Sequence, residues 1–177
     1  MNLEDILQKN RYLKDLHSGK RCFIIGNGPS TKTQNLHLLR DEVSIAANSF
    51  YYHPEAKLIN PDYWIIADPI YWEKPDVVSS DFEFAANKAV SPKMFVPTGG
   101  FKCFSKINII PLIDLHFFHY DSSKDINARI DFAQGIPTYG QNVIVVALML
   151  ATYLGCTPIY LIGCDHDFTN IKKEEYN

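Results

Sequence analysis

Short apolar runs alternate with polar and glycine-rich segments along most of this chain. The apolar runs occupy residues 22–25, 43–47, 63–67, 94–96 and 158–162. Each run stops at small or polar residues. A continuous apolar run of this kind, bounded by turn-forming residues, is typical of a strand that is buried on both faces of a parallel sheet. The pattern therefore predicts five buried strands.

Two of the segments between these runs have the length and pattern of crossover helices. They are residues 76–90 and residues 140–153, and the second lies directly before the last predicted strand. Strand, polar turn, helix and strand in succession indicate an open α/β fold. We therefore expect a mostly parallel, Rossmann-like sheet with helices on both faces. Residues 101–134 have no clean period and predict mixed structure.

The two ends of the chain depart from this pattern. Residues 1–19 place Leu3, Ile6, Leu13 and Leu16 among charged residues, which predicts an amphipathic helix that ends near Gly19. Residues 166–177 are polar and charged and predict a tail. A chain of 177 residues has the usual length of one domain, so we expect residues 1–177 to form a single α/β unit.

Composition and charge narrow the class of protein. With 46% hydrophobic residues and 21% charged residues, the chain can bury a substantial core. Its formal net charge of −3 gives no basic field for a nucleic acid, so we expect no nucleic-acid partner. The four cysteines form no Cys-x-x-Cys pair and predict reduced, buried thiols.

The same features predict a location. The acidic, polar amino terminus does not have the pattern of a secretory signal. The longest apolar run, residues 143–154, is shorter than the roughly twenty residues that span a bilayer, so we expect no transmembrane segment. The sequence predicts a cytoplasmic protein, with a peripheral position at the inner membrane face as the alternative.

Polar side chains and glycines follow the first three predicted strands. The first strand is followed by Gly26, Asn27, Gly28, Pro29 and Ser30, the second by Asn48 and the third by Asp68. Ligands of open α/β sheets bind outside the carboxyl ends of the strands, so these residues are candidates for nucleotide binding. The loop matches neither the dinucleotide fingerprint nor a P-loop. A tight turn at residues 26–30, and capping roles for Asn48 and Asp68, are the structural alternatives.

A second candidate ligand site precedes the apolar helix. Thr138, Tyr139 and Gly140 stand where free amide groups at a helix start bind a phosphate or carboxylate. Thr138 is equally placed to be an N-cap neighbour of that helix.

The end of the last predicted strand carries an acidic motif. Gly163 and Cys164 are followed by Asp165, His166 and Asp167, and Gly163 and Asp165 are further candidates for nucleotide binding. Two carboxylates at this spacing suit Mg²⁺ or Mn²⁺ bridging a diphosphate, so Asp165 and Asp167 are the candidate metal ligands. His166 and Asp165 are the candidate catalytic residues, although an exposed turn histidine without a catalytic role is an alternative for His166.

The remaining histidines have no metal-ligand spacing. His116 and His119 are three residues apart, and we expect them to belong to a structural aromatic cluster with Phe117, Phe118 and Tyr120.

Three short blocks resemble a known superfamily. They are Phe-Ile-Ile-Gly-Asn-Gly-Pro-Ser at 23–30, Asn-Ser-Phe-Tyr-Tyr at 48–52, and the stretch from Leu154 to Asp165. Together they are similar to bacterial lipooligosaccharide sialyltransferases and to the related 6-hydroxymethylpterin pyrophosphokinase-like proteins, which include flagellin glycosylation factors. In the sialyltransferases the matching loop and asparagine contact a cytidine nucleotide, which implies nucleotide-binding roles for Asn27, Gly28, Ser30 and Asn48.

The departures from that superfamily shape the functional hypotheses. Asp68 stands where the sialyltransferases carry asparagine, and Tyr139 stands in place of a serine before the long helix. The catalytic histidine and phosphate-binding tyrosines of those enzymes lie beyond the Gly-x-Asp block. The resemblance therefore implies a nucleotide-binding domain that lacks a carboxyl-terminal catalytic segment, and the base that activates the acceptor stays unidentified.

We expect a transferase that binds a nucleotide sugar, CMP-sialic-acid-like or another, and transfers the sugar to a glycan or small-molecule acceptor in surface glycan or glycoprotein assembly. A Mg²⁺-dependent pterin pyrophosphokinase and a non-catalytic nucleotide-binding module are the alternatives. Self-association into a homo-oligomer is left open.

Overall fold

A computed structural model describes residues 2–74, 92–106, 114–125, 127–138 and 142–165. The predicted helix over residues 76–90 lies outside this part of the chain, as do Tyr139, Gly140, His166 and Asp167.

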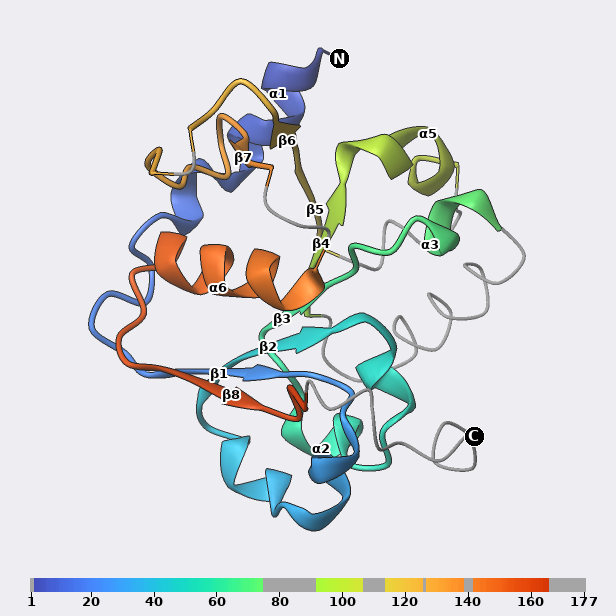
Figure 1. Ribbon diagram of the computed structural model, residues 1–177, viewed down its shortest axis with the longest axis vertical. Coiled ribbons are helices and arrows are strands. Elements are labelled where there is room, and N and C mark those ends of the chain that lie inside the picture. Colours follow the sequence, from blue (N-terminus) through green and yellow to red (C-terminus); the bar gives the residue numbers. More distant parts are fainter. Residues whose placement is uncertain (1, 75–91, 107–113, 126, 139–141, 166–177) are drawn as a thin grey trace.

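The centre of the molecule is a six-stranded parallel sheet with the strand order β5-β4-β3-β2-β1-β8 (Figure 1). Its strands are β1 (Cys22–Ile25), β2 (Val43–Ala47), β3 (Tyr63–Ile65), β4 (Lys93–Pro97), β5 (Asp114–Phe118) and β8 (Ile159–Ile162). The predicted open, parallel α/β sheet is therefore confirmed. The structure adds β5, which lies in the region that the sequence left as mixed structure.

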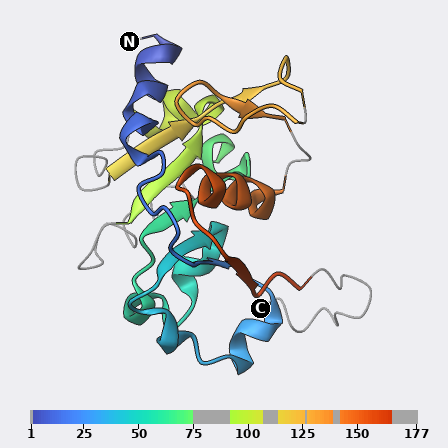
Figure 2. The same cartoon turned by 90° about the vertical axis from the view of Figure 1, so that its left-hand side faces the viewer.

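Strands β1 to β4 are largely buried, and neighbouring residues of each strand point into cores on opposite faces of the sheet. The prediction of a buried strand at residues 158–162 is wrong, because β8 lies at the edge of the sheet and exposes Tyr160 and Leu161. Ile25, Ala46 and Trp64 belong to one core, together with α2 (Ala56–Ile59) and residues of the amino-terminal helix. Ile24 and Ile45 belong to the other core, which α6 (Val143–Tyr153) covers. Figures 1 and 2 show α6 and α2 on opposite faces of the sheet.

Short elements complete the fold between the strands and around their ends. They are α1 (Leu3–Gln8), α3 (Ile70–Glu73), α5 (Phe101–Phe104), the paired strands β6 (Tyr120–Asp121) and β7 (Ile136–Pro137), and 3-10 helices at Lys9–Leu13, Pro29–Thr33, Leu36–Leu39, Asn48–Tyr52 and Thr98–Gly100.

The amino-terminal helix is shorter than expected. Asn2 and Asp5 form a capping box that starts α1, which continues as a 3-10 helix to Leu13. Beyond Leu13, the backbone N–H groups of residues 15, 17 and 19 donate to the carbonyl oxygens of residues 153–155 rather than to a preceding helical turn. Because these tertiary hydrogen bonds satisfy the backbone, the predicted helix over residues 1–19 ends early.

The direction in which the chain adds strands reverses at β1. Strands β2 to β5 follow one another on one side of β1, whereas β8 lies on the other side. In open α/β sheets such a reversal opens a crevice at the carboxyl ends of the strands. The loop at residues 26–30 and the end of β8 meet at this point.

No helix within the described ranges has the length and apolar character that a bilayer crossing requires.

Candidate functional site

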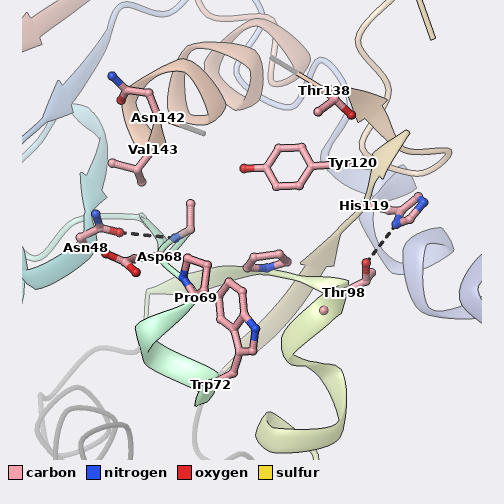
Figure 3. A pocket seen from close by; sticks show the side chains of 13 residues that line it. Asn48, Asp68, Pro69, Trp72, Thr98, His119, Tyr120, Thr138, Asn142 and Val143 are labelled. Carbon is pink, nitrogen blue, oxygen red and sulfur yellow. Dashed lines mark hydrogen bonds between the residues drawn. The ribbon is translucent and has the colours of Figure 1, made fainter. Parts of the chain in front are cut away.

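A pocket of about 900 Å³ lies at the carboxyl edge of the sheet (Figure 3). It lies beyond the ends of β2, β3, β4 and β5 and beside the start of α6. Its lining combines polar groups with two large aromatic rings. The lining residues are Asn48, Ala67, Asp68, Pro69, Trp72, Pro97, Thr98, Gly99, His119, Tyr120, Thr138, Asn142 and Val143.

Asn48, the first residue after β2, is held in an unusual backbone conformation. Its φ is +43°, a left-handed value that asparagine adopts more readily than most residues. The indole Nε1 of Trp64 donates to its carbonyl oxygen at 2.8 Å, and the backbone N–H of Ala67 donates to its Oδ1 at 3.4 Å. Since Oδ1 faces an N–H group, the amide Nδ2 is the atom left to donate into the pocket.

Asp68 follows β3 and starts the turn into α3. Its Oδ1 accepts a hydrogen bond from the backbone N–H of Ile70 at 3.0 Å. The side chain therefore has the capping role that the sequence left open, and it also lines the pocket. The turn directs α3 so that Trp72 forms one wall of the pocket.

Thr98 and His119 form a hydrogen-bonded pair on the other side of the pocket. Thr98 follows β4, His119 follows β5, and the Thr98 hydroxyl lies 3.0 Å from His119 Nδ1. Figure 3 shows the pair opposite Asn48 and Asp68, with the Tyr120 ring between the two sides. The sequence placed His119 in a structural aromatic cluster and did not identify Thr98. The strand-end rule that selected Asn48 and Asp68 applies equally to Thr98.

The start of α6 closes the pocket. The Asn142 side chain caps this helix by accepting from the backbone N–H of Ile144 at 2.8 Å. Thr138 lines the pocket, as its predicted role in ligand binding requires. Its two predicted partners, Tyr139 and Gly140, lie outside the described residues.

The glycine-rich loop after β1 packs against the end of β8. Gly28 N–H donates to the carbonyl oxygen of Gly163 at 2.8 Å. A Cβ atom on Gly26 would collide with that carbonyl group, and one on Gly28 would collide with the Asp165 carboxylate. These glycines therefore permit a close approach between two segments of the protein, where the sequence suggested an approach to a ligand.

Two polar side chains of this loop also bind protein groups. The Ser30 backbone N–H and hydroxyl donate to the two carboxylate oxygens of Asp165 at 2.7 and 2.6 Å. Asn27 Nδ2 donates to the Ala47 carbonyl oxygen at 3.1 Å. Residues 26–30, Gly163 and Asp165 are thus brought together, but the pocket is lined by Asn48, Asp68 and Thr138 without them.

A protein-family model described as 6-hydroxymethylpterin diphosphokinase MptE-like matches residues 1–171. The chain belongs to this family. The match confirms the predicted resemblance to the 6-hydroxymethylpterin pyrophosphokinase-like proteins. A comparison with curated proteins gives no significant match.

The described part of this MptE-like chain includes one of the two predicted metal ligands. Asp165 is described and accepts from Ser30, whereas Asp167 and the candidate catalytic His166 are not described. Within the described ranges, no group of three or more His, Cys, Asp or Glu side chains is arranged to hold a metal ion. A Mg²⁺ or Mn²⁺ ion at Asp165 and Asp167 stays a prediction.

The described lining residues of the pocket in this family member carry little charge. Among its described lining residues, Asp68 is the carboxylate and His119 is the titratable base, and the lining includes no lysine or arginine. Burial raises the pKa of Tyr120 above its usual value, so its phenol is a neutral hydrogen-bond donor near pH 7. The lining therefore offers hydrogen-bond donors rather than fixed positive charge.

Proposed function

We propose that this pocket binds the nucleotide of an activated donor and that the protein is a transferase, which moves a glycosyl group to an acceptor hydroxyl in surface glycan or glycoprotein assembly. The observation that carries the proposal is the backbone conformation and hydrogen bonding of Asn48. A residue held at positive φ by two protein hydrogen bonds, with its amide donor left toward a pocket, is the kind of strained position that clusters at ligand sites.

The size and walls of the pocket support a nucleotide as the ligand. A volume of about 900 Å³ lies at the upper end of the range for small-molecule sites and has room for a donor and part of an acceptor. Trp72 and Tyr120 supply flat, half-buried aromatic surfaces. Such surfaces stack favourably on a planar base, by about 1–3 kcal/mol in single-stranded nucleic-acid sites.

The charge of the lining favours a donor with few phosphates. A diphosphate carries more negative charge than a monophosphate and usually requires a cation or basic side chains. The described lining offers neither lysine nor arginine, and it includes the negative Asp68. A nucleoside monophosphate sugar fits this lining with less charge to neutralise than a nucleoside diphosphate sugar.

A second candidate is favoured by the family description. Diphosphate transfer from ATP to a pterin alcohol would fit an MptE-like chain, and the planar pterin would suit the same aromatic walls. This reaction needs a divalent cation on the phosphates. Asp68 in the pocket and Asp165 at the loop would be candidate ligands.

A panel of nucleotides separates these functions. We expect CMP to raise the melting temperature of the full chain more than CDP, UDP, GDP or ATP, with little change when Mg²⁺ is added. The measurement is a thermal-shift assay followed by calorimetry. Stabilisation by ATP only together with Mg²⁺ would favour the diphosphokinase. A protein that responds to none of the five nucleotides would contradict both enzymatic functions.

The metal prediction is tested by Asp165→Asn. Because both carboxylate oxygens accept hydrogen bonds from Ser30, we expect this change to lower the free energy of unfolding by about 1–2 kcal/mol. If Asp165 also holds a metal ion, any stabilisation by Mg²⁺ should disappear at the same time. A Mg²⁺ response that survives in the folded variant would rule out Asp165 as a metal ligand.

A further inference from the structure

We propose that His119 is the base that accepts the proton of the acceptor hydroxyl, and that Thr98 relays this proton to it. This inference rests on the proposed transferase function, and it assigns the acceptor side of the pocket to these two residues.

The position of the pair supports this assignment. Thr98 and His119 both line the pocket, and they lie across it from Asn48 and Asp68 (Figure 3). A donor bound on the Asn48 side would therefore leave the Thr98 side for the second substrate. Thr98 directly follows β4 and His119 directly follows β5, the edge strand that pairs with β4, so the paired parallel backbone fixes their spacing.

The hydrogen bond between the two side chains provides the route for the proton. At 3.0 Å from Nδ1, the Thr98 hydroxyl can donate its proton to the imidazole. A hydroxyl group also has two acceptor lone pairs, so Thr98 can accept from a substrate hydroxyl at the same time. The arrangement is that of a hydroxyl and a base within hydrogen-bond reach.

Two proton transfers accompany the transfer of the sugar. The acceptor O–H proton moves to the Thr98 oxygen while the Thr98 proton moves to His119 Nδ1. The acceptor oxygen forms a bond to the sugar carbon of the donor, and the bond from that carbon to the phosphate oxygen breaks. Its electron pair stays on the departing nucleotide, and the imidazolium later releases its proton to water.

Charged groups lie near His119 along the chain and across the pocket from it. Asp121, two residues further along the chain, is held ionised because hydrogen bonds from Ser123 and the nearby charges of Lys124 and His119 lower the pKa of its carboxyl. Asp68 lies across the pocket. Lys124 opposes these carboxylates, but its Nζ is bound to the Gly135 carbonyl oxygen at 2.7 Å.

Four variants test the proposal. His119→Gln removes the base, Thr98→Val removes the relay hydroxyl, and Thr98→Ser restores it. His37→Gln, at an exposed histidine on the 3-10 helix Leu36–Leu39, is the matched control. Each protein is checked for folding by its melting temperature. Nucleotide affinity is then measured by calorimetry with CMP, CDP, UDP, GDP and ATP.

The catalytic readout is release of the nucleotide from CMP-sialic acid, UDP-glucose or GDP-mannose between pH 5 and 9, with water as the acceptor. We expect the wild-type rate to rise with pH through one transition. His119→Gln and Thr98→Val should lower the rate by about 100-fold or more and flatten the pH profile. Thr98→Ser and His37→Gln should stay within about fivefold of wild type, and nucleotide affinity should change less than threefold throughout.

The possible failures are distinguishable. A wild-type protein that binds none of the nucleotides overturns the proposed function, and the inference about His119 falls with it. If a nucleotide binds but His119→Gln keeps the wild-type rate and pH profile, or no donor is turned over, the inference alone is overturned. A loss of nucleotide affinity in His119→Gln equal to its loss of rate would make His119 a donor-binding residue and also overturn it.

Discussion

Replacing Asn48 by aspartate is expected to weaken nucleotide binding by about 100-fold or more. The variant keeps an oxygen that accepts from the Ala67 N–H, and aspartate also tolerates the positive φ at this position. It loses the Nδ2 donor and adds a negative charge to a pocket that already contains Asp68. Loss of one hydrogen bond to a charged or polar ligand group costs about 1.5–3 kcal/mol, and repulsion of a phosphate adds to it.

Two companion variants make this result specific. Asn48→Gly removes the side chain without backbone strain and should weaken binding by about tenfold. Asn35→Asp adds the same charge at an exposed position on another loop and should leave binding unchanged. Calorimetry with the nucleotide that gives the largest thermal shift provides the affinities. If Asn48→Asp binds that nucleotide as tightly as the wild type, Asn48 contacts no ligand, and its conformation serves the fold alone.

Replacing Asn10 by alanine is expected to lower the free energy of unfolding by about 3–5 kcal/mol. Asn10 is fully buried, and its Nδ2 donates to the carbonyl oxygens of Phe117 and Phe132 at 2.7 and 2.8 Å. Its Oδ1 lies 2.8 Å from Nδ1 of the buried His116. Burial lowers the pKa of His116 to about 4, so its ring is neutral at pH 7, with Nδ1 at hydrogen-bond distance from Asn10 and Nε2 at 3.2 Å from the Asp114 carboxylate. In the alanine variant, the carbonyl oxygens of Phe117 and Phe132 and the Nδ1 atom of His116 would lose their hydrogen bonds to Asn10. Each buried polar group left without a partner costs about 1–3 kcal/mol of stability before the structure relaxes.

Denaturant unfolding at pH 7 measures this loss, with Asn35→Ala at an exposed position as the control, expected to change stability by less than about 0.5 kcal/mol. Phe117 precedes His119 by two residues, so the Asn10 contact also supports the strand that leads to the pocket. A loss below about 1 kcal/mol in Asn10→Ala would mean that water or a rearranged side chain replaces the buried hydrogen bonds.

The sequence identified the strands that are apolar throughout and the polar residues that end them. Residues 22–25 and 43–47 coincide with β1 and β2, because a strand buried on both faces needs apolar side chains at successive positions. The residues that follow such strands include Asn48 and Asp68, whereas Thr138 was selected because it precedes a predicted helix start, and the structure brings these three residues into one pocket.

The sequence of β5 contains no comparable apolar run. Strand β5 reads Asp-Leu-His-Phe-Phe, and its buried His116 interrupts the apolar run. That histidine is accommodated because Asn10 reaches it from more than a hundred positions earlier in the chain. Since the partner is so distant in sequence, no local pattern could show that this segment is a strand of the parallel sheet or that His119 follows it into the pocket.

Local patterns therefore determined the class of fold and the edge of the sheet at which the pocket lies, since hydrophobic periodicity and turn chemistry act between neighbouring residues. Tertiary structure alone decided which strand ends line the pocket and which pack against another segment of the protein. The loop at residues 26–30 closes onto Gly163 and Asp165, while Asn48, Asp68, Thr98 and His119 surround the open pocket. That division depends on the strand order, in which β8 lies beside β1, and strand order is set by packing between segments far apart in the sequence.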